Sequence, residues 1–212
     1  ESHHDILQAN FVDAYYNNTY KMMMGLKYVT DQCLTNNKTS YLLVIDGDYA
    51  LNVYNLEAYI RYINKPTGLY CGQTWWNSGP YRIPYHKHYL TISDYPYSAF
   101  PPYVTGGAML LSADVVEKFY ITSQYTKYFP FDDVFYGMLA KKLGIVPTDM
   151  GDLLPSYHNV PQPTDSKNVM TVGSHRFGDL YDVEHIYLQY GQEQYMSSND
   201  FSAHYNKEIN KS

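Results

Sequence analysis

Short apolar runs alternate with amphipathic segments along the first two thirds of the chain. Residues 41–45 form a continuous apolar run, which predicts a strand buried on both faces of a parallel or mixed sheet. Residues 108–111 predict another buried strand, and residues 6–12 predict a short strand near the beginning. Buried strands that alternate with helices indicate an α/β fold.

Four helices are expected between these runs. Apolar positions at helical spacing predict the first over residues 17–33, and the second from about Asn55. Ser112 is a suitable N-cap for the third helix. The fourth opens at Asp132 and ends at Gly144, a residue type favoured just past a helix end. The aromatic and proline-rich residues 75–103 predict loops and short strands.

Composition narrows the possible functions. The chain has 212 residues, of which 45% are hydrophobic and 17% charged, and this is globular composition. A formal net charge of -6 argues against nucleic acid as a partner. No apolar run approaches the ~20 residues that cross a bilayer, so we expect any membrane anchor to lie outside this chain. The 26 tyrosines combine apolar rings with hydroxyls, which suits polar ligands such as sugars, although most of them are expected around a mixed core.

Two further patterns leave alternatives open. Cys33 and Cys71 either pair with each other or stay free, and they match no zinc motif. The sequons Asn17-Asn18-Thr19 and Asn37-Lys38-Thr39 give weak support for passage through the secretory pathway. For Asn17 we favour a different interpretation, in which its side chain caps the following helix.

Candidate chemistry begins at Asp46-Gly47-Asp48, directly after the apolar run 41–45. Ligands of open α/β sheets bind beyond the carboxyl ends of strands, and residues two apart in extended chain point the same way. Two carboxylates placed there suit a hard cation such as Mg²⁺ or Mn²⁺, which could neutralise a diphosphate. The alternative is a simple turn that ends the strand.

A second pair of acids, Asp132 and Asp133, opens the fourth helix. One can cap the helix and the other can meet the positive end of its dipole, an environment that favours the ionised form and so a general base. The alternative is a pair of acids that only starts a helix. The adjacent Gly106 and Gly107 permit close approach of the backbone to a ligand or, more commonly, a tight turn.

Taken in order, these segments resemble the β1,3-glycosyltransferases of glycosyltransferase family 31, which add galactose or N-acetylglucosamine to glycan acceptors. The likeness spans roughly residues 5 to 175. It rests on Asp5 to Lys21, Asp46 to Asn52, Gly79 to Arg82 with Lys87, Tyr95-Pro96, Tyr103 to Ser112, Asp132 to Gly137 and Leu143 to Ile145.

The resemblance implies a GT-A-type α/β fold with a mixed central sheet, apparently missing its first strands. Residues 1–190 would form the catalytic domain and residues 191–212 a polar tail. It further implies Asp133 as catalytic base. The metal, Mn²⁺, would be bound by Asp48, Asp46 and His175, and the UDP-sugar donor by Asp46, Gly106, Gly107, Arg82 and Lys87.

The implied function is inverting transfer of galactose or an N-acetylhexosamine from the UDP-sugar to a glycan on protein or lipid, in β1,3 linkage. By the same resemblance the protein would act on the lumenal side of the Golgi membrane. Gly47 and Val44 depart from the family pattern, which has an acid and a lysine there. A different class of function stays open, that of a non-catalytic relative that binds glycans or a partner transferase. A phosphotransferase is disfavoured because the sequence has no P-loop.

Overall fold

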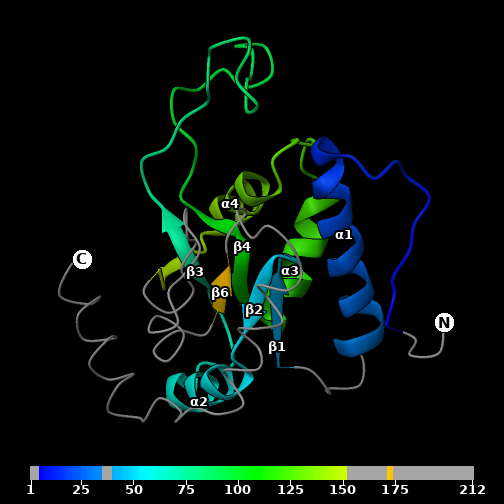
Figure 1. Ribbon diagram of the computed structural model, residues 1–212, viewed down its shortest axis with the longest axis vertical. Coiled ribbons are helices and arrows are strands. Elements are labelled where there is room, and N and C mark those ends of the chain that lie inside the picture. The colour runs from blue at the N-terminus through cyan, green and yellow to red at the C-terminus, as the bar shows by residue number, and fades with distance from the viewer. Residues whose placement is uncertain (1–4, 35–39, 152–170, 174–212) are drawn as a thin grey trace.

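The structure, a computed structural model, describes residues 5–34, 40–151 and 171–173. Its central sheet has the strand order β1-β4-β3-β5 (Figure 1). The strands are β1 Tyr41–Ile45, β3 Tyr70–Trp75, β4 Tyr103–Ser112 and β5 Thr148–Asp149. β4 is antiparallel to both neighbours, whereas β3 and β5 are parallel. The expected α/β fold with a mixed central sheet is therefore confirmed.

A second, two-stranded sheet pairs β2 Tyr49–Leu51 with β6 Thr171–Gly173 in antiparallel register. The helices are α1 Asn18–Tyr28, α2 Val53–Ile63, α3 Ala113–Ser123 and α4 Asp132–Leu143. A short 3₁₀ turn, Tyr15–Asn17, precedes α1, and a π-helical turn, Val29–Leu34, continues it. Figure 1 shows α1 and α3 side by side.

The central strand β4 is buried on both faces, and its alternating side chains enter two different cores. Met109 and Leu111 pack into a cluster with residues of α1, α3 and α4. Ala108 and Leu110 belong to a second cluster that contains Tyr59 of α2. Because side chains alternate across a strand, one strand serves both layers of helices.

Two of the predicted strands differ from the structure. Within the described residues β1 pairs only with β4, so it lies at the edge of the sheet and all its side chains are only partly buried. Residues 5–14, all of them described, contain neither helix nor strand, so the strand predicted over residues 6–12 is wrong. Ile6 and Val12 of this segment are 81% and 74% exposed. An apolar run forms a strand only where a sheet edge receives it.

The helix ends follow local capping chemistry. α2 begins two residues before Asn55 because the side chain of Asn52 accepts a hydrogen bond from the Asn55 backbone N–H at 3.1 Å. α4 starts at Asp132 as expected, and Gly144 follows it in the left-handed conformation at φ 68°. Glycine adopts that conformation without the cost that a Cβ imposes.

The start of α1 is tied to the segment that precedes α4. The buried Thr19 donates its hydroxyl proton to the carbonyl of Phe129 at 2.7 Å. Asn17 donates its side-chain amide to the carbonyl of Val12 at 2.8 Å, back along the chain. The capping interpretation of Asn17 is therefore wrong. Asn37 of the second sequon lies outside the described residues.

Cys33 and Cys71 are both free thiols. Cys71 is fully buried, and this burial raises the pKa of its thiol to about 12. Such a thiol stays protonated and unreactive at neutral pH. In residues 5–34, 40–151 and 171–173, no helix is both long and apolar enough to cross a membrane.

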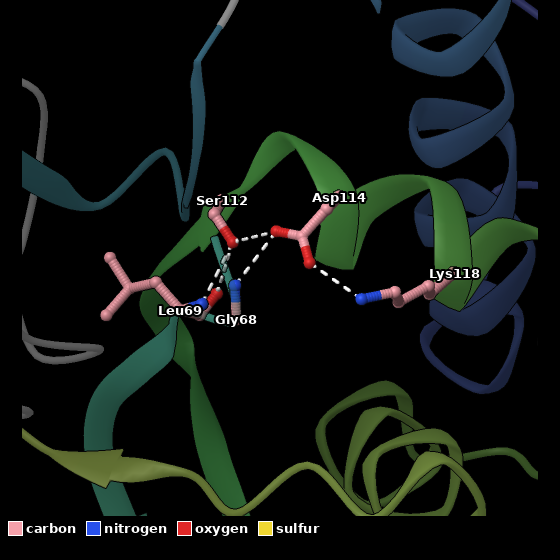
Figure 2. A network of polar contacts seen from close by, with 5 residues as sticks. All are labelled: Gly68, Leu69, Ser112, Asp114 and Lys118. Carbon is pink, nitrogen blue, oxygen red and sulfur yellow. Dashed lines mark hydrogen bonds and ion pairs between the residues drawn. The ribbon is translucent and has the colours of Figure 1, made fainter. Parts of the chain in front are cut away.

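A polar network fastens the β4–α3 junction to the loop before β3 (Figure 2). The Asp114 carboxylate accepts hydrogen bonds from the Gly68 N–H at 2.9 Å, from the Ser112 hydroxyl at 2.6 Å and from Lys118 Nζ at 2.7 Å. The Ser112 hydroxyl accepts in turn from the Leu69 N–H at 2.9 Å. Burial raises the pKa of Asp114, but these hydrogen bonds from Lys118, Ser112 and Gly68 outweigh it and lower the pKa overall.

We expect Asp114→Ala to lower the free energy of unfolding by about 1–2 kcal/mol, because it leaves the Gly68 N–H without its acceptor and the Ser112 hydroxyl with only a longer bond of 3.5 Å to the Leu69 carbonyl. A carboxyl with a lowered pKa stabilises the fold above its unfolded pKa, so this contribution should fade as the pH falls through the folded pKa. Urea unfolding at pH 7 and at pH 3 measures both effects. Lys118→Met is the control, since an exposed ion pair contributes at most about 1 kcal/mol. Equal losses in the two variants would contradict the network.

Candidate active site

A tight turn carries the first two acids beyond the end of β1. The carbonyl of Asp46 accepts the N–H of Tyr49 at 3.1 Å, so residues 46–49 close a turn between β1 and β2. The N–H of Asp46 donates to the carbonyl of Gly107 at 3.0 Å, which fixes the turn against β4. Asp46 is exposed and Asp48 is partly buried. The carboxylates therefore stand at the rim of the sheet, where ligands of α/β folds bind.

The glycine pair lies inside strand β4, so the tight-turn interpretation is wrong. A Cβ on Gly107 would lie 2.3 Å from the hydroxyl oxygen of Tyr49, so the strand needs glycine there to admit that ring. A Cβ on Gly106 would lie 3.9 Å from Oδ2 of Asp132 and 4.0 Å from Cβ of Asp133. The glycines thus lie between the turn 46–49 and the first turn of α4.

The acids of α4 and Asp46, which follows β1, share one region of the molecule. Asp132 and Asp133 occupy the first turn of α4, and both keep some exposure to solvent. The charge of Asp46 lies close enough to Asp133 to raise the pKa of that carboxyl. Carboxylates from two separate segments of the chain, the turn 46–49 and the first turn of α4, therefore lie in one region.

The carboxyl of Asp133 is protonated more readily than an ordinary aspartate. Burial, the neighbouring charge of Asp132 and the charge of Asp46 raise its pKa, and the N–H of Val134, which donates to Oδ1 at 2.7 Å, lowers it. The net result is a pKa of about 7. The expectation that the helix start favours the ionised form is therefore wrong, because desolvation outweighs the helix dipole. A carboxyl that titrates near neutral pH suits a general base.

Tyr15 also belongs to this region, and the sequence did not single it out. Burial together with the charges of Asp133, Asp132 and Asp46 raises the pKa of Tyr15 to about 12, so its phenol lies in the same region as these carboxylates. Its hydroxyl forms a hydrogen bond of 2.7 Å with Nε2 of His88. The tyrosine-rich composition gave no signal that distinguishes Tyr15 from its neighbours.

The two basic residues predicted to bind the donor occupy the loop between β3 and β4, which projects beyond the sheet (Figure 1). Arg82 donates to the carbonyls of Leu90 at 2.8 Å, Thr91 at 2.7 Å, Tyr95 at 2.6 Å and Tyr97 at 3.2 Å. These bonds give Arg82 a structural role in holding the loop together, and its donor contact stays a prediction.

Lys87 contacts the turn before α1. Its Nζ stands 4.4 Å from the ring centroid of Tyr15, and its carbonyl accepts the hydroxyl of Tyr16 at 3.0 Å. The next residue, His88, packs edge-on against Phe131, which directly precedes the acids of α4, with ring centroids 5.2 Å apart. The loop thus contacts both the turn before α1 and the residue that precedes the acids of α4.

Comparison with known proteins decides the family. A family model described as galactosyltransferase matches residues 1–151, which contain all the described acids discussed above. The chain belongs to the galactosyltransferase family.

Named relatives agree with this assignment. The chain is similar to β-1,3-galactosyltransferase brn of Drosophila melanogaster, with 34% identity over 188 residues that cover 87% of this chain and 56% of the relative. It is also similar to β-1,3-galactosyltransferase bre-5 of Caenorhabditis elegans, with 31% identity over 85% of this chain and 55% of the relative. Mouse β-1,3-galactosyltransferase 1 is 36% identical over 68% of this chain and 44% of its own length. The chain spans about half the length of these galactosyltransferases.

The expected metal site of this galactosyltransferase-family chain is only partly described. His175 lies outside the described residues, two positions beyond Gly173, whose backbone pairs with Tyr49 next to Asp48. Among the residues that the structure describes, no group of three or more His, Cys, Asp or Glu side chains is placed to hold a metal ion. Asp46 and Asp48 nevertheless supply hard oxygen donors, and Mg²⁺-like ions are commonly bound by one or two carboxylates together with substrate phosphates. These two carboxylates are therefore suitable ligands for such an ion.

Proposed function

We propose that the protein is an inverting, metal-dependent β1,3-galactosyltransferase that uses a UDP-sugar donor and a glycan acceptor. The observation that carries the proposal is the convergence of Asp46, Asp132 and Asp133 in a chain of the galactosyltransferase family. Relatives named β-1,3-galactosyltransferase favour galactose as the sugar and a β1,3 linkage as the product. The lumenal side of the Golgi membrane is the place of action that we propose with this reaction.

Asp133 is the proposed base. Its carboxylate takes the proton from the acceptor hydroxyl while that oxygen attacks C1 of the donor galactose. The bond between C1 and the diphosphate oxygen breaks on the opposite face of the sugar, so the configuration at C1 inverts and UDP leaves. A pKa of about 7 keeps a large fraction of Asp133 ionised at neutral pH while leaving it basic enough to accept the proton.

The turn 46–49 would hold the diphosphate end of the donor. Asp48 and Asp46 would bind Mn²⁺, with His175 as a further proposed ligand. When bound, the ion supplies positive charge that neutralises the diphosphate and stabilises it as a leaving group. The backbone of Gly106, which lies beside the first turn of α4, would face the donor sugar.

We expect the protein to bind UDP tightly only with Mn²⁺ present, and Asp48→Ala to weaken this binding at least tenfold, because it removes a ligand of the ion. Calorimetry with UDP, with and without Mn²⁺, measures the binding, and transfer from UDP-galactose to a simple saccharide measures the reaction. Glu57→Ala on α2 is the matched control, since it removes an exposed acid. Mn²⁺-independent binding would contradict the metal assignment. Binding without transfer to any acceptor would favour a non-catalytic, glycan-binding relative.

A further inference from the structure

Tyr15 joins three segments that lie far apart in the sequence. Its ring belongs to the 3₁₀ turn before α1, and its hydroxyl bonds to Nε2 of His88, 73 positions along the chain. The rings of Tyr15 and His88 are also nearly parallel, with centroids 6.0 Å apart and 21° between their planes. His88 in turn packs edge-on against Phe131 at the entrance to α4. Tyr15 therefore links the β3–β4 loop to the region of the acids.

Several contacts fix the segment around Tyr15 to the chain that precedes α4. The buried hydroxyl of Thr19 donates to the carbonyl of Phe129. The hydroxyl of Tyr128 donates to the carbonyl of Tyr16, and the ring of Tyr128 stacks on Tyr20 with centroids 4.5 Å apart. Residues 15–20 are thus fixed to the chain segment that leads directly into Asp132 and Asp133. A side chain on this support keeps a constant place relative to the acids.

Lys87 is held by Tyr15 in a way that preserves its charge. The ammonium lies over the ring face at 4.4 Å from the centroid, a cation–π contact, and the carbonyl of Lys87 accepts the hydroxyl of Tyr16. A ring face attracts the ammonium without neutralising it as a carboxylate would. The cation therefore remains able to meet an anionic ligand.

We propose that Tyr15 is a positioning residue that holds Lys87 and His88 of the β3–β4 loop beside the acids, so that the Lys87 ammonium meets the diphosphate of the donor. This inference rests on the proposed function for the identity of the ligand. Tyr15 acts through Lys87 and makes no contact with the reacting atoms in this assignment. Its phenol stays protonated at neutral pH, since its pKa is about 12.

The test compares Tyr15→Leu, Tyr15→Phe and Lys87→Met, with Tyr28→Leu as a control that removes a similarly exposed tyrosine from α1. We expect Tyr15→Leu and Lys87→Met each to raise KM for UDP-galactose about five- to tenfold with a smaller change in kcat. The double variant should be no worse than either single one, because both remove the same contact. Tyr15→Phe keeps the ring beneath Lys87 and removes only the hydrogen bond to His88, so its KM should rise clearly less than that of Tyr15→Leu. Additive effects, or an unchanged KM in Tyr15→Leu, would overturn the proposal.

Binding of inorganic pyrophosphate with Mn²⁺, followed by calorimetry, separates this inference from the proposed function. If the wild-type protein binds pyrophosphate and Tyr15→Leu and Lys87→Met weaken this binding equally, the positioning role is supported even where no sugar is transferred. If transfer proceeds and both variants bind pyrophosphate like the wild type, the positioning role falls and the proposed function stands. Failure of the wild-type protein to bind pyrophosphate would also overturn the positioning role.

Discussion

Asp133→Asn is expected to lower kcat/KM for galactose transfer by about 10²–10⁴-fold, the contribution typical of a positioned general base. The amide fills nearly the same volume as the carboxyl but cannot accept the acceptor's proton. Steady-state transfer from UDP-galactose, at saturating Mn²⁺, measures the loss. Near-normal turnover of this variant would show that another group is the base.

The same substitution should stabilise the fold at alkaline pH. Asp133 has a folded pKa of about 7, above its unfolded value, so its stabilising contribution is fully present below the unfolded pKa and is lost as the pH rises through about 7. Removing an ionised carboxylate that Asp132 and Asp46 repel should therefore raise the free energy of unfolding at pH 8 by on the order of 2 kcal/mol. Loss of activity with gain of stability is the signature of a functional rather than a structural acid.

Asp132→Asn is the matched control for Asp133, because the charge of Asp132 is one cause of the raised pKa of Asp133. In this variant the acidic limb of the pH profile of kcat/KM should move to lower pH, while the activity above pH 8 changes much less. An unmoved acidic limb would mean that Asp133 does not control it.

Gly107→Ala is expected to lower the free energy of unfolding by about 1–3 kcal/mol, the usual cost of forcing extra volume into a packed interior. The new Cβ would lie 2.3 Å from the hydroxyl oxygen and 2.5 Å from Cζ of Tyr49. Tyr49 is only 4% exposed, so its ring has little room to move away. Because Tyr49 closes the turn that carries Asp46 and Asp48, a shifted ring should also weaken Mn²⁺-dependent UDP binding.

Gly106→Ala is the control for this substitution. Its Cβ would have no neighbour nearer than 3.9 Å among the described residues, an ordinary contact distance, so the fold should tolerate it. Urea unfolding of both variants compares their stabilities directly. Equal denaturation midpoints would contradict the close packing of Tyr49 on Gly107.

The features that the sequence predicted well, helix ends and turns, depend on residues that are neighbours in the chain. The bounds of α4 followed from acids at its start and Gly144 at its end, because capping depends on a few neighbouring residues. The turn at Asp46 could likewise be read from an apolar run that stops at acids and glycine. The family resemblance added Asp133, and the structure places that acid near Asp46.

What the sequence missed depends on contacts between distant segments. Tyr15 resembles many other tyrosines until His88 and Lys87 are folded against it. The ionisation of Asp133 was misjudged because burial and neighbouring charges, both tertiary properties, outweigh the helix dipole. The partial burial of β1 has the same origin, since an apolar run does not reveal whether it lies at the centre or the edge of a sheet.

The hydrogen-bonded hydroxyl of Thr19 affects when the first sequon, Asn17-Asn18-Thr19, can be glycosylated. An enzyme that attaches a glycan to Asn17 must reach that threonine, yet in the folded chain the side chain is fully buried and bonded to Phe129. Carbohydrate at Asn17 could therefore be added only before α1 docks, while the nascent chain is still open. A glycan found at Asn17 would therefore have been attached before this part of the chain folded.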